Sequence, residues 1–288
     1  MPLNKFNLRE LEVKANDIRT SIVEMLVEAG SGHTAGPLGM ADVFVALYFE
    51  ILNHKPENPD WSERDRLVLS NGHICPVLYA TMAHVGYFEI KELQTLRKFG
   101  SRLQGHPHRE FLPYLENSSG PLGSGLSQAV GMAIADRIDN GIATSKYIYC
   151  ILGDGELNEG NNWEAIMLAG KEKLRNVIAI VDRNNIQIDG YTEDIMPLDD
   201  LNKKWESFNW HVQEIDGNNI EAVINAVRTA KAVFEKPSVI IARTIPGKGV
   251  REFERKFEWH GKAPNKEEAK MALNELRTLG GKIKSEHQ

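Results

Sequence analysis

The sequence contains very little cysteine, and its two thiols lie far apart along the chain. Cys75 and Cys150 form no C-x-x-C pair, and apolar residues flank both of them. A disulfide framework or a cysteine-ligated zinc site needs more cysteines at closer spacing. We therefore expect two reduced, buried thiols with no part in the chemistry.

Long apolar runs and a surplus of basic residues are also missing. No stretch approaches the roughly 18 to 20 apolar residues that a membrane helix requires, and residues 1–5 lack the apolar core of a signal peptide. The formal net charge is −6, which gives no basic footprint for nucleic acid. These absences predict a cytoplasmic protein that binds neither membranes nor nucleic acid.

The chain of 288 residues has no internal repeat, and short apolar runs alternate with amphipathic stretches. This alternation favours an α/β fold with a doubly wound, mainly parallel sheet flanked by helices, in a single domain over residues 1–288. The expected strands are 66–70, 147–152, 176–181, 211–215 and 238–244, and the expected helices are 16–29, 40–52, 120–140 and 220–234. A last helix is expected to begin with a cap at 265–268 and to end at Gly280-Gly281. The charged segment 247–255 reads as an exposed loop, either a solvated connection or a mobile lid.

Residues 147–190 are the most informative segment. Runs 147–152 and 176–181 have the length and β-branched content of buried parallel strands, and helix-forming residues separate them. Gly153-Asp154-Gly155 follows the first run and Asn184-Asn185 follows the second. Because ligands of such βαβ units bind beyond the carboxyl ends of the strands, we expect both motifs to reach one ligand.

The residue types in these two motifs suit a magnesium-bound phosphate. Mg²⁺ is commonly held by one or two carboxylates or amides together with phosphates, and Asp154 and Asn184 offer both kinds of oxygen. The flanking glycines let backbone N–H groups approach a phosphate. Gly-Asp-Gly by itself is more often an ordinary strand-to-helix turn, so the pairing with Asn184-Asn185 is what favours a site.

Four of the nine histidines lie in glycine-rich or proline-flanked motifs where loops are expected: His33, His73, His106 and His260. The other five are interpreted as structural or surface residues: His54, His84, His108, His211 and His287. Loops above a parallel sheet can converge. Imidazole, with an ordinary pKa of about 6.5, is suited to accept and release protons near neutral pH.

Gly153-Asp154-Gly155 with Asn184-Asn185 resembles the cofactor motif of thiamin diphosphate enzymes, and the chain is more narrowly similar to the transketolase family. Several further blocks, in family order over nearly the whole chain, carry this resemblance: Ser31-Gly32-His33, Gly36-Pro37-Leu38-Gly39, Arg64-Asp65-Arg66, Leu69-Ser70-Asn71-Gly72-His73, Gly105-His106-Pro107, Gly120-Pro121-Leu122-Gly123 and 259–264.

The resemblance implies the thiamin diphosphate-binding fold, in its diphosphate domain, with thiamin diphosphate and Mg²⁺ as cofactors. Ca²⁺ and Mn²⁺ are the expected substitutes for Mg²⁺. The implied metal ligands are Asp154, the side chain of Asn184 and the main-chain carbonyl of Ile186. The implied cofactor-binding residues are His73, Gly120, Leu122, Gly153, Asp154, Gly155, Glu156, Asn184 and Ile186.

The same resemblance implies catalytic roles. The cofactor would provide the nucleophile and the electron sink, so the protein has to steer protons. His106 would contact the donor's hydroxymethyl-carbonyl end, His33 and His260 would handle the hydroxyl whose proton moves, and His73 would line the channel. Glu159 matches a glutamate that the family places where the two halves of the active site meet.

Full-length transketolases continue into a pyrimidine-binding domain and a third domain, which the resemblance does not cover here. That part contains the glutamate that activates thiamin. It also contains most of the residues that bind the phosphate of the sugar. We therefore expect the N-terminal subunit of a split transketolase, active only with a C-terminal subunit, in an assembly with two copies of each chain. The expected reaction moves a two-carbon ketol unit from a ketose phosphate to an aldose phosphate in pentose phosphate metabolism.

Two alternatives stay open. The first is another thiamin diphosphate-dependent ketol or acyl transferase, either deoxyxylulose-phosphate-synthase-like or a transketolase for an unusual sugar phosphate. Lys248 and the block 259–261 favour transketolase. The second is a non-catalytic thiamin diphosphate-binding subunit, and the presence of His33 and His260 argues against it.

Overall fold

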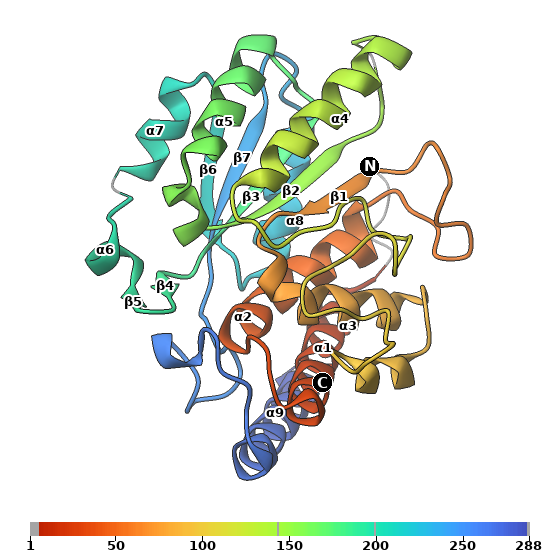
Figure 1. The fold of residues 1–288 in the computed structure, drawn as a ribbon, viewed down its shortest axis with the longest axis vertical. Helices are drawn as coiled ribbons and strands as arrows, with labels where there is room; N and C mark the ends of the chain where they lie inside the picture. The colour runs from red at the N-terminus through yellow and green to blue at the C-terminus, as the bar shows by residue number, and fades with distance from the viewer. Residues whose placement is uncertain (1–5, 143, 199, 287–288) are drawn as a thin grey trace.

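The fold is built on a five-stranded sheet in which every pairing is parallel (Figure 1). The computed structural model describes residues 6–142, 144–198 and 200–286, the last three without their side chains; the expectations for residues 1–5 and His287 fall outside this range. In spatial order the strands are β1 (Arg66–Leu69), β2 (Ile148–Gly153), β3 (Val177–Arg183), β7 (Ser238–Arg243) and β6 (His211–Asp216). A small antiparallel hairpin of β4 (Ile186–Gln187) and β5 (Gly190–Tyr191) follows β3.

Alternate side chains of each central strand enter different cores, because successive residues of a strand point to opposite faces. In β2, Cys150 and Leu152 belong to one core, whereas Tyr149 and Ile151 belong to the other. The first core is covered by α4 (Ser124–Asn140), α5 (Gly160–Glu172) and α7 (Leu201–Ser207). The second is covered by α1 (Leu8–Ala29), α2 (Ala35–Val45), α3 (Cys75–Val85) and α8 (Ile220–Lys231).

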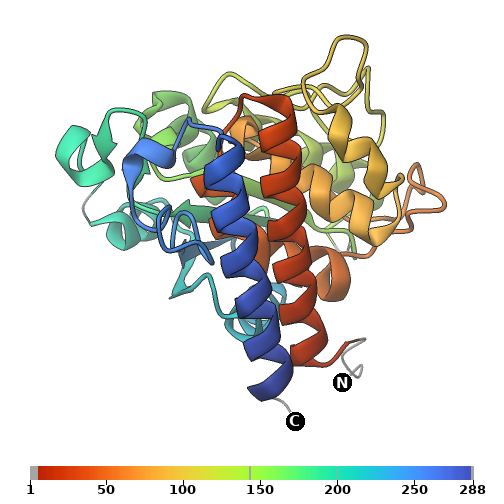
Figure 2. The ribbon, with the colours of Figure 1, turned by 90° about the horizontal axis from the view of Figure 1, so that it is seen from below.

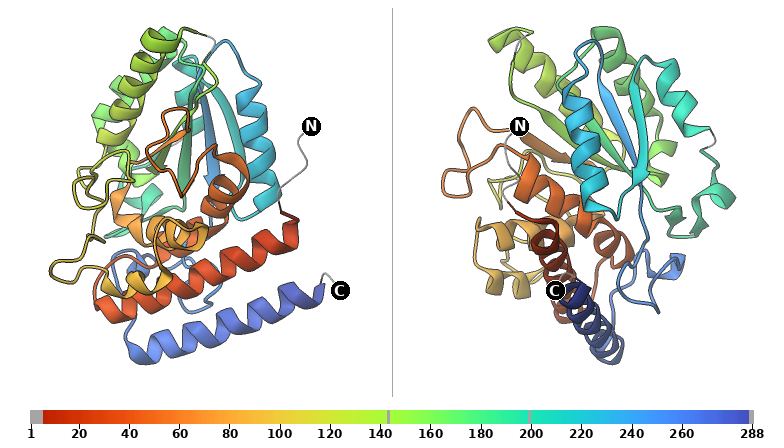
Figure 3. Two further views of the ribbon diagram at one scale, coloured as in Figure 1. Left: turned by 90° about the vertical axis from the view of Figure 1, so that its right-hand side faces the viewer. Right: turned by 180° about the vertical axis from the view of Figure 1, so that it is seen from behind.

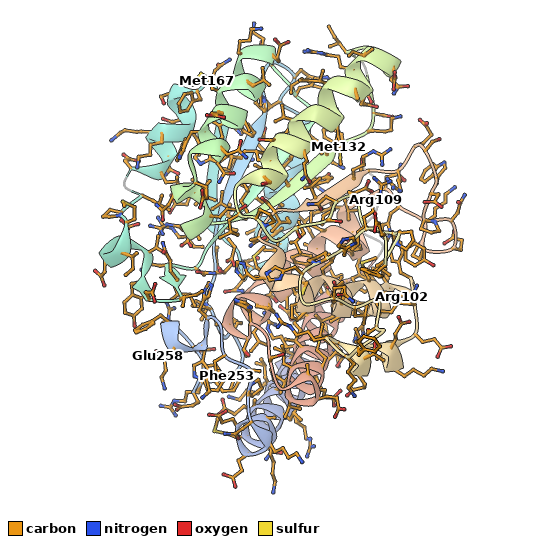
Figure 4. All side chains as sticks on the ribbon, in the orientation of Figure 1. Arg102, Arg109, Met132, Met167, Phe253 and Glu258 are labelled. Carbon is orange, nitrogen blue, oxygen red and sulfur yellow. The ribbon has the colours of Figure 1, made fainter. Side chains whose placement is uncertain are left out.

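Figure 3 shows these helices on both sides of the sheet, and in Figure 4 the labels Met132 and Met167 mark α4 and α5. Shorter helical elements complete the chain: the π-helix Ala46–Ile51, the 3-10 helices Gly72–Ile74, Ile90–Thr95, Gly155–Asn158 and Phe257–Trp259, and α6 (Thr192–Ile195). The predicted doubly wound α/β fold is confirmed.

The predicted strands are all present within two residues of their expected bounds, but three helix starts differ. α1 begins at Leu8, where Asn7 and Glu10 form a reciprocal capping box, rather than at residue 16. The second helix begins at Ala35, so Gly36 and Pro37 lie inside its first turn. α4 begins at Ser124 rather than at residue 120, because Gly123 adopts a left-handed conformation (φ 85°) just before it.

The predicted end of the last helix at Gly280-Gly281 is wrong. α9 runs from Lys266 to Glu286, and it lies beside α1 (Figure 2). A Cβ atom on Gly280 would lie 3.0 Å from Asn16 Nδ2, which donates a hydrogen bond to the carbonyl of Leu276 at 3.1 Å. Gly280 therefore permits close packing of the two helices instead of ending one.

Segment 247–255 is a loop, as predicted, with Arg251, Glu252 and Arg255 exposed, but it is anchored by buried residues that its charges do not predict. Val250 and Phe253 are fully buried, and the ring centroids of Phe253 and Trp259 are 3.7 Å apart. In Figure 4 the labels Phe253 and Glu258 mark this region. The two aromatic residues anchor the segment that leads to His260.

Two expectations drawn from absences can be compared with the structure. Cys75 and Cys150 are buried and unbonded to each other, as predicted. Across residues 6–142, 144–198 and 200–286, every helix is too short or too polar to cross a membrane.

Candidate active site

A pocket of about 460 Å³ lies where the carboxyl ends of β1, β2 and β3 meet. A residue that lines the pocket follows the end of each strand by one or two positions: Asn71 after β1, Asp154 after β2 and Asn184 after β3. The other lining residues are His33, His73, His106, Gly120, Leu122, Gly153, Gly155, Glu156, Asp182, Ile186, Gln187, Ile188, Asp189 and His260. The pocket thus brings together all the sequence-predicted site residues except Glu159.

Asp154 is held rigidly in the turn after β2. It is only 2% exposed. Its Oδ1 accepts a hydrogen bond from the backbone of Gly155 at 2.7 Å, and its Oδ2 accepts one from the backbone of Asn185 at 2.7 Å and one from Arg183 at 3.0 Å. Burial raises the pKa of Asp154, and the Arg183 guanidinium opposes that rise. The carboxylate therefore ties the turn after β2 to Asn185, which follows β3.

Asn184 is oriented by its neighbours in the second motif. Its Nδ2 donates to Asp182 at 2.8 Å, and its Oδ1 accepts from the backbone of Ile186 at 3.0 Å. Asp182 is fully buried and also accepts a hydrogen bond from the Thr244 hydroxyl. Burial raises the pKa of Asp182 to about 7. These contacts decide which way the Asn184 amide points.

The described residues contain no group of three or more His, Cys, Asp or Glu side chains that could hold a metal. A metal at this edge would have to use one carboxylate with amide and main-chain oxygens. Asp154, Asn184 and the carbonyl of Ile186 are such a set, and Mg²⁺ accepts one or two protein carboxylates when phosphates complete its shell. The residues present therefore fit a magnesium diphosphate.

Three imidazole rings form a cluster on another wall of the pocket. The ring centroids of His33 and His73 are 4.8 Å apart, those of His73 and His260 are 5.2 Å apart, and those of His33 and His260 are 5.5 Å apart. His106 lines the same pocket, and its ring would lie 3.9 Å from a Cβ atom on Gly120. All four histidines selected from the sequence are thus together.

Burial keeps these histidines neutral. It lowers the pKa of His33 to about 4, with further contributions from His260 and Arg97, and it lowers the pKa of His260 to about 4. Burial also lowers the pKa values of His73 and His106. Neutral imidazoles at neutral pH can accept a proton from a hydroxyl and return it.

Glu156 joins three elements beneath the pocket. One carboxylate oxygen accepts hydrogen bonds from the Ser70 hydroxyl and from the backbone of Gly123 at 2.8 Å. The other accepts from the backbone of Gly153 at 3.0 Å. Glu156 is 2% exposed, and burial raises its pKa. Its contacts hold the ends of β1 and β2 against the start of α4.

Glu159 does not line the pocket. It is an exposed residue at the N-cap of α5, and its Cβ would lie 2.8 Å from a Cβ atom on Gly123. The structure therefore places Glu159 beside the Gly120–Gly123 block, outside the cavity.

Several residues that line the pocket were not predicted from the sequence: Asn71, Asp182, Gln187, Ile188 and Asp189. Each lies within or directly beside a motif that had been selected. Arg183 was missed as well, although it contacts both Asp154 and Glu193. The only feature of the sequence that could have indicated these residues is their position within or beside the motifs. His54, His84, His108 and His211, interpreted as structural or surface residues, are absent from the pocket lining.

The fold and the pocket define an α/β enzyme domain that combines an oxygen-ligand turn with a histidine cluster at the carboxyl edge of its sheet. Residues 11–280 match the family model for the transketolase thiamine diphosphate binding domain. The chain belongs to the transketolase family, as its N-terminal, thiamin diphosphate-binding type of subunit.

Relatives of similar length support this assignment. The chain is 45% identical to SqwG, a subunit of the 6-deoxy-6-sulfo-D-fructose transketolase of Clostridium sp. (strain MSTE9), over 94% of this chain and 98% of the relative. It is 40% identical to a subunit of the apulose-4-phosphate transketolase of Actinobacillus succinogenes, over 96% of this chain and 99% of the relative.

Longer transketolases contain the same fold. The chain spans 43% of the Campylobacter jejuni transketolase structure, with a TM-score of 0.88 and 35% identity over 96% of this chain. It also spans 40% of the length of Escherichia coli transketolase 2, to which it is 40% identical over 91% of this chain.

Proposed function

We propose that the pocket binds thiamin diphosphate through Mg²⁺, with Asp154, Asn184 and the carbonyl of Ile186 as metal ligands. The observation that carries this proposal is the shared pocket, in which one end offers oxygen ligands and the other offers neutral histidines. The N–H of Gly155, which donates to Asp154 Oδ1 in the free chain, would face the diphosphate. Gly120, Leu122, His73 and Glu156 would line or support the same group.

The histidines would perform the proton transfers of a ketol transfer. When bound, the cofactor supplies the nucleophile and the electron sink. His33 and His260 would accept and return the proton of the sugar hydroxyl next to the bond that breaks or forms. His106 would hydrogen-bond the donor's carbonyl end, and His73 would line the channel between cofactor and substrate. Glu159, outside the pocket, would act where this chain meets its partner.

A partner subunit completes the proposed enzyme. The relatives of similar length are themselves named as transketolase subunits, and the longer transketolases extend well beyond the region that this chain matches. We infer a second chain that carries the pyrimidine-binding domain and the activating glutamate, with two copies of each chain in the assembly. A cytoplasmic location belongs to the same proposal.

The proposed reaction transfers a two-carbon ketol unit from a ketose phosphate to an aldose phosphate. An unusual donor is a second candidate, favoured by the 45% identity to a subunit named for 6-deoxy-6-sulfo-D-fructose. The two are separated by comparing turnover of a pentose or hexose phosphate donor with turnover of the 6-sulfonated ketose, using one aldose phosphate acceptor. Pyruvate with a triose phosphate is the donor pair that would instead support a synthase-like reaction.

The first experiment is native mass spectrometry of the protein purified from its own host with thiamin diphosphate and Mg²⁺, followed by assay of the complex. Equal copies of this chain and a second chain, with ketol-transfer activity, would support the proposal. A complex whose activity survives both His33→Ala and His260→Ala would contradict the catalytic assignment and favour a non-catalytic subunit. A homo-oligomer that is active without a partner would contradict the split arrangement.

A further inference from the structure

The side chain of Asn71 is buried in the pocket with neither of its polar atoms hydrogen-bonded. Asn71 is 1% exposed, and both Oδ1 and Nδ2 lack a partner. Buried amides in proteins are nearly always satisfied, so an exception calls for a reason. Asn71 lines the pocket that also contains Asp154 and His73. The unsatisfied groups are therefore available to a molecule that enters it.

The position of the amide nitrogen indicates which part of such a molecule it meets. Asn71 Nδ2 would lie 3.7 Å from a Cβ atom on Gly153, the first residue of the turn that contains Asp154. The donor end of the amide thus lies next to a turn whose backbone N–H groups already donate within the protein, to Glu156, Asp182 and Asp154. A carboxamide N–H₂ in that position adds a hydrogen-bond donor to the same wall.

The backbone fixes this side chain in place. Asn71 has φ −77° and ψ 65°, and the Gly72 N–H donates to the Ser70 carbonyl at 2.9 Å, so Asn71 is the central residue of an inverse γ-turn. On one side, the Ser70 hydroxyl is tied to Glu156. On the other, Gly72 lies so close to Ser119 that a Cβ atom there would approach Ser119 Oγ to 2.4 Å. Neighbours on both sides hold the turn.

We propose that Asn71 is a further cofactor-binding residue, whose Nδ2 donates a hydrogen bond to a diphosphate oxygen of thiamin diphosphate. This inference rests on the proposed function. It gives a reason for a buried amide that has no hydrogen-bond partner in the free protein. Such a group lowers the stability of the fold until a ligand hydrogen-bonds to it. It also assigns the residue between β1 and His73 to the anion-binding end of the pocket.

The test compares Asn71→Leu, which keeps the size of the side chain and removes its hydrogen bonds, with Asn117→Leu as the matched control. Asn117 is also buried near β1, but its Nδ2 donates to the carbonyl of Leu69 at 3.4 Å and it does not line the pocket. Thiamin diphosphate affinity is measured by calorimetry with excess Mg²⁺, on the full chain and on its complex with the partner subunit. The melting temperature of each cofactor-free variant is measured in parallel.

The proposal predicts opposite behaviour for the two variants. Asn71→Leu should weaken thiamin diphosphate binding by about 10- to 100-fold, the effect of a lost hydrogen bond to a charged group, while the cofactor-free protein melts no lower than wild type. Asn117→Leu should lower the melting temperature and leave the affinity unchanged. In ³¹P NMR at saturating cofactor, Asn71→Leu should shift a diphosphate resonance.

Other results would overturn the inference in distinguishable ways. Unchanged affinity in Asn71→Leu, with wild type binding normally, would remove Asn71 from the cofactor site and leave the proposed function intact. A lower melting temperature of the cofactor-free variant would make Asn71 a structural residue. Weakened binding with unshifted phosphorus resonances would overturn the diphosphate contact. Failure of the wild-type chain and of its complex to bind thiamin diphosphate would overturn the proposed function itself.

Discussion

At the residue scale, burial decides the charge of the histidine cluster. His33 and His260 each have a buried Nδ1 without a hydrogen-bond partner, and burial lowers both pKa values to about 4. Rings this close would repel each other if both were protonated, so proximity and burial act in the same direction. The cluster is therefore a set of neutral bases at neutral pH.

This charge state predicts how stability depends on pH. The pKa of each ring is lower in the folded chain (about 4) than in the unfolded chain (about 6.5), so the unfolded chain binds more protons between these values. The contribution of these two rings to the free energy of unfolding should be largest above about pH 6.5 and should fall as the pH drops towards 4, whereas the raised pKa of Asp182 acts in the opposite direction. His33→Gln should reduce the slope of the unfolding free energy against pH by the equivalent of about one bound proton. Adding His260→Gln should reduce that slope by about one more. Urea unfolding of the cofactor-free chain at several pH values measures the slope, and equal slopes in all three proteins would contradict the prediction.

The residues that sequence reasoning found share one property, which is that each belongs to a motif of unusual composition. Asp154, Asn184 and the four histidines fall beside glycines, prolines or strand ends, and the structure places them in one pocket. Asn71 was missed because its importance lies in two hydrogen bonds that it does not make. Unsatisfied burial is a three-dimensional property, and no residue pattern reports it.

At the scale of elements, α4 contains two glycines with opposite expected behaviour. A Cβ atom on Gly125 would approach Ser70 Cβ to 2.4 Å, whereas one on Gly131 would meet nothing within 4 Å. Gly125→Ala should destabilise the chain by about 1–3 kcal/mol or more, because it forces α4 away from the end of β1. Gly131→Ala should stabilise it by about 0.5–1 kcal/mol, because glycine in a helix interior is entropically costly. Denaturant titration of both variants is the measurement, and unchanged stability in Gly125→Ala would argue against the close-packing explanation.

The strands could be predicted more accurately than the helix ends. β2 and β3 are apolar on both faces because both cores use them, which gives short, uniform runs that are easy to recognise. The end of α9 could not be predicted, since Gly280 is a good stop signal locally and its real role depends on Asn16 in another helix. The burial of Val250 and Phe253 escaped prediction because charged neighbours surround them in sequence.

At the scale of the whole molecule, cofactor and metal should stabilise the fold together. Thiamin diphosphate with Mg²⁺ at about 100 times its dissociation constant should add about 2.7 kcal/mol to the free energy of unfolding. A chelator should abolish the gain, because the Asp154 carboxylate would then face the diphosphate without a cation between them. Thermal melts with cofactor, metal and chelator measure this for the chain and for its complex.

Two variants sharpen that measurement. Asp154→Asn should lose the stabilisation by cofactor and metal even without chelator. Asp200→Asn is the control, because Asp200 is an exposed helix cap of α7 away from the pocket. Stabilisation that persists in Asp154→Asn would place the metal elsewhere.

The walls of the pocket come from distant parts of the chain, and this has a consequence for how the protein is made. Thr34, next to His33, donates a hydrogen bond to the carbonyl of Lys262 across a separation of 228 residues. During synthesis the strands of the sheet, which all lie before residue 244, can begin to pair before this contact is possible, because Lys262 is made after all of them. Competence to bind cofactor should thus appear only after Lys262 has left the ribosome, which makes bound cofactor a reporter of the closed pocket.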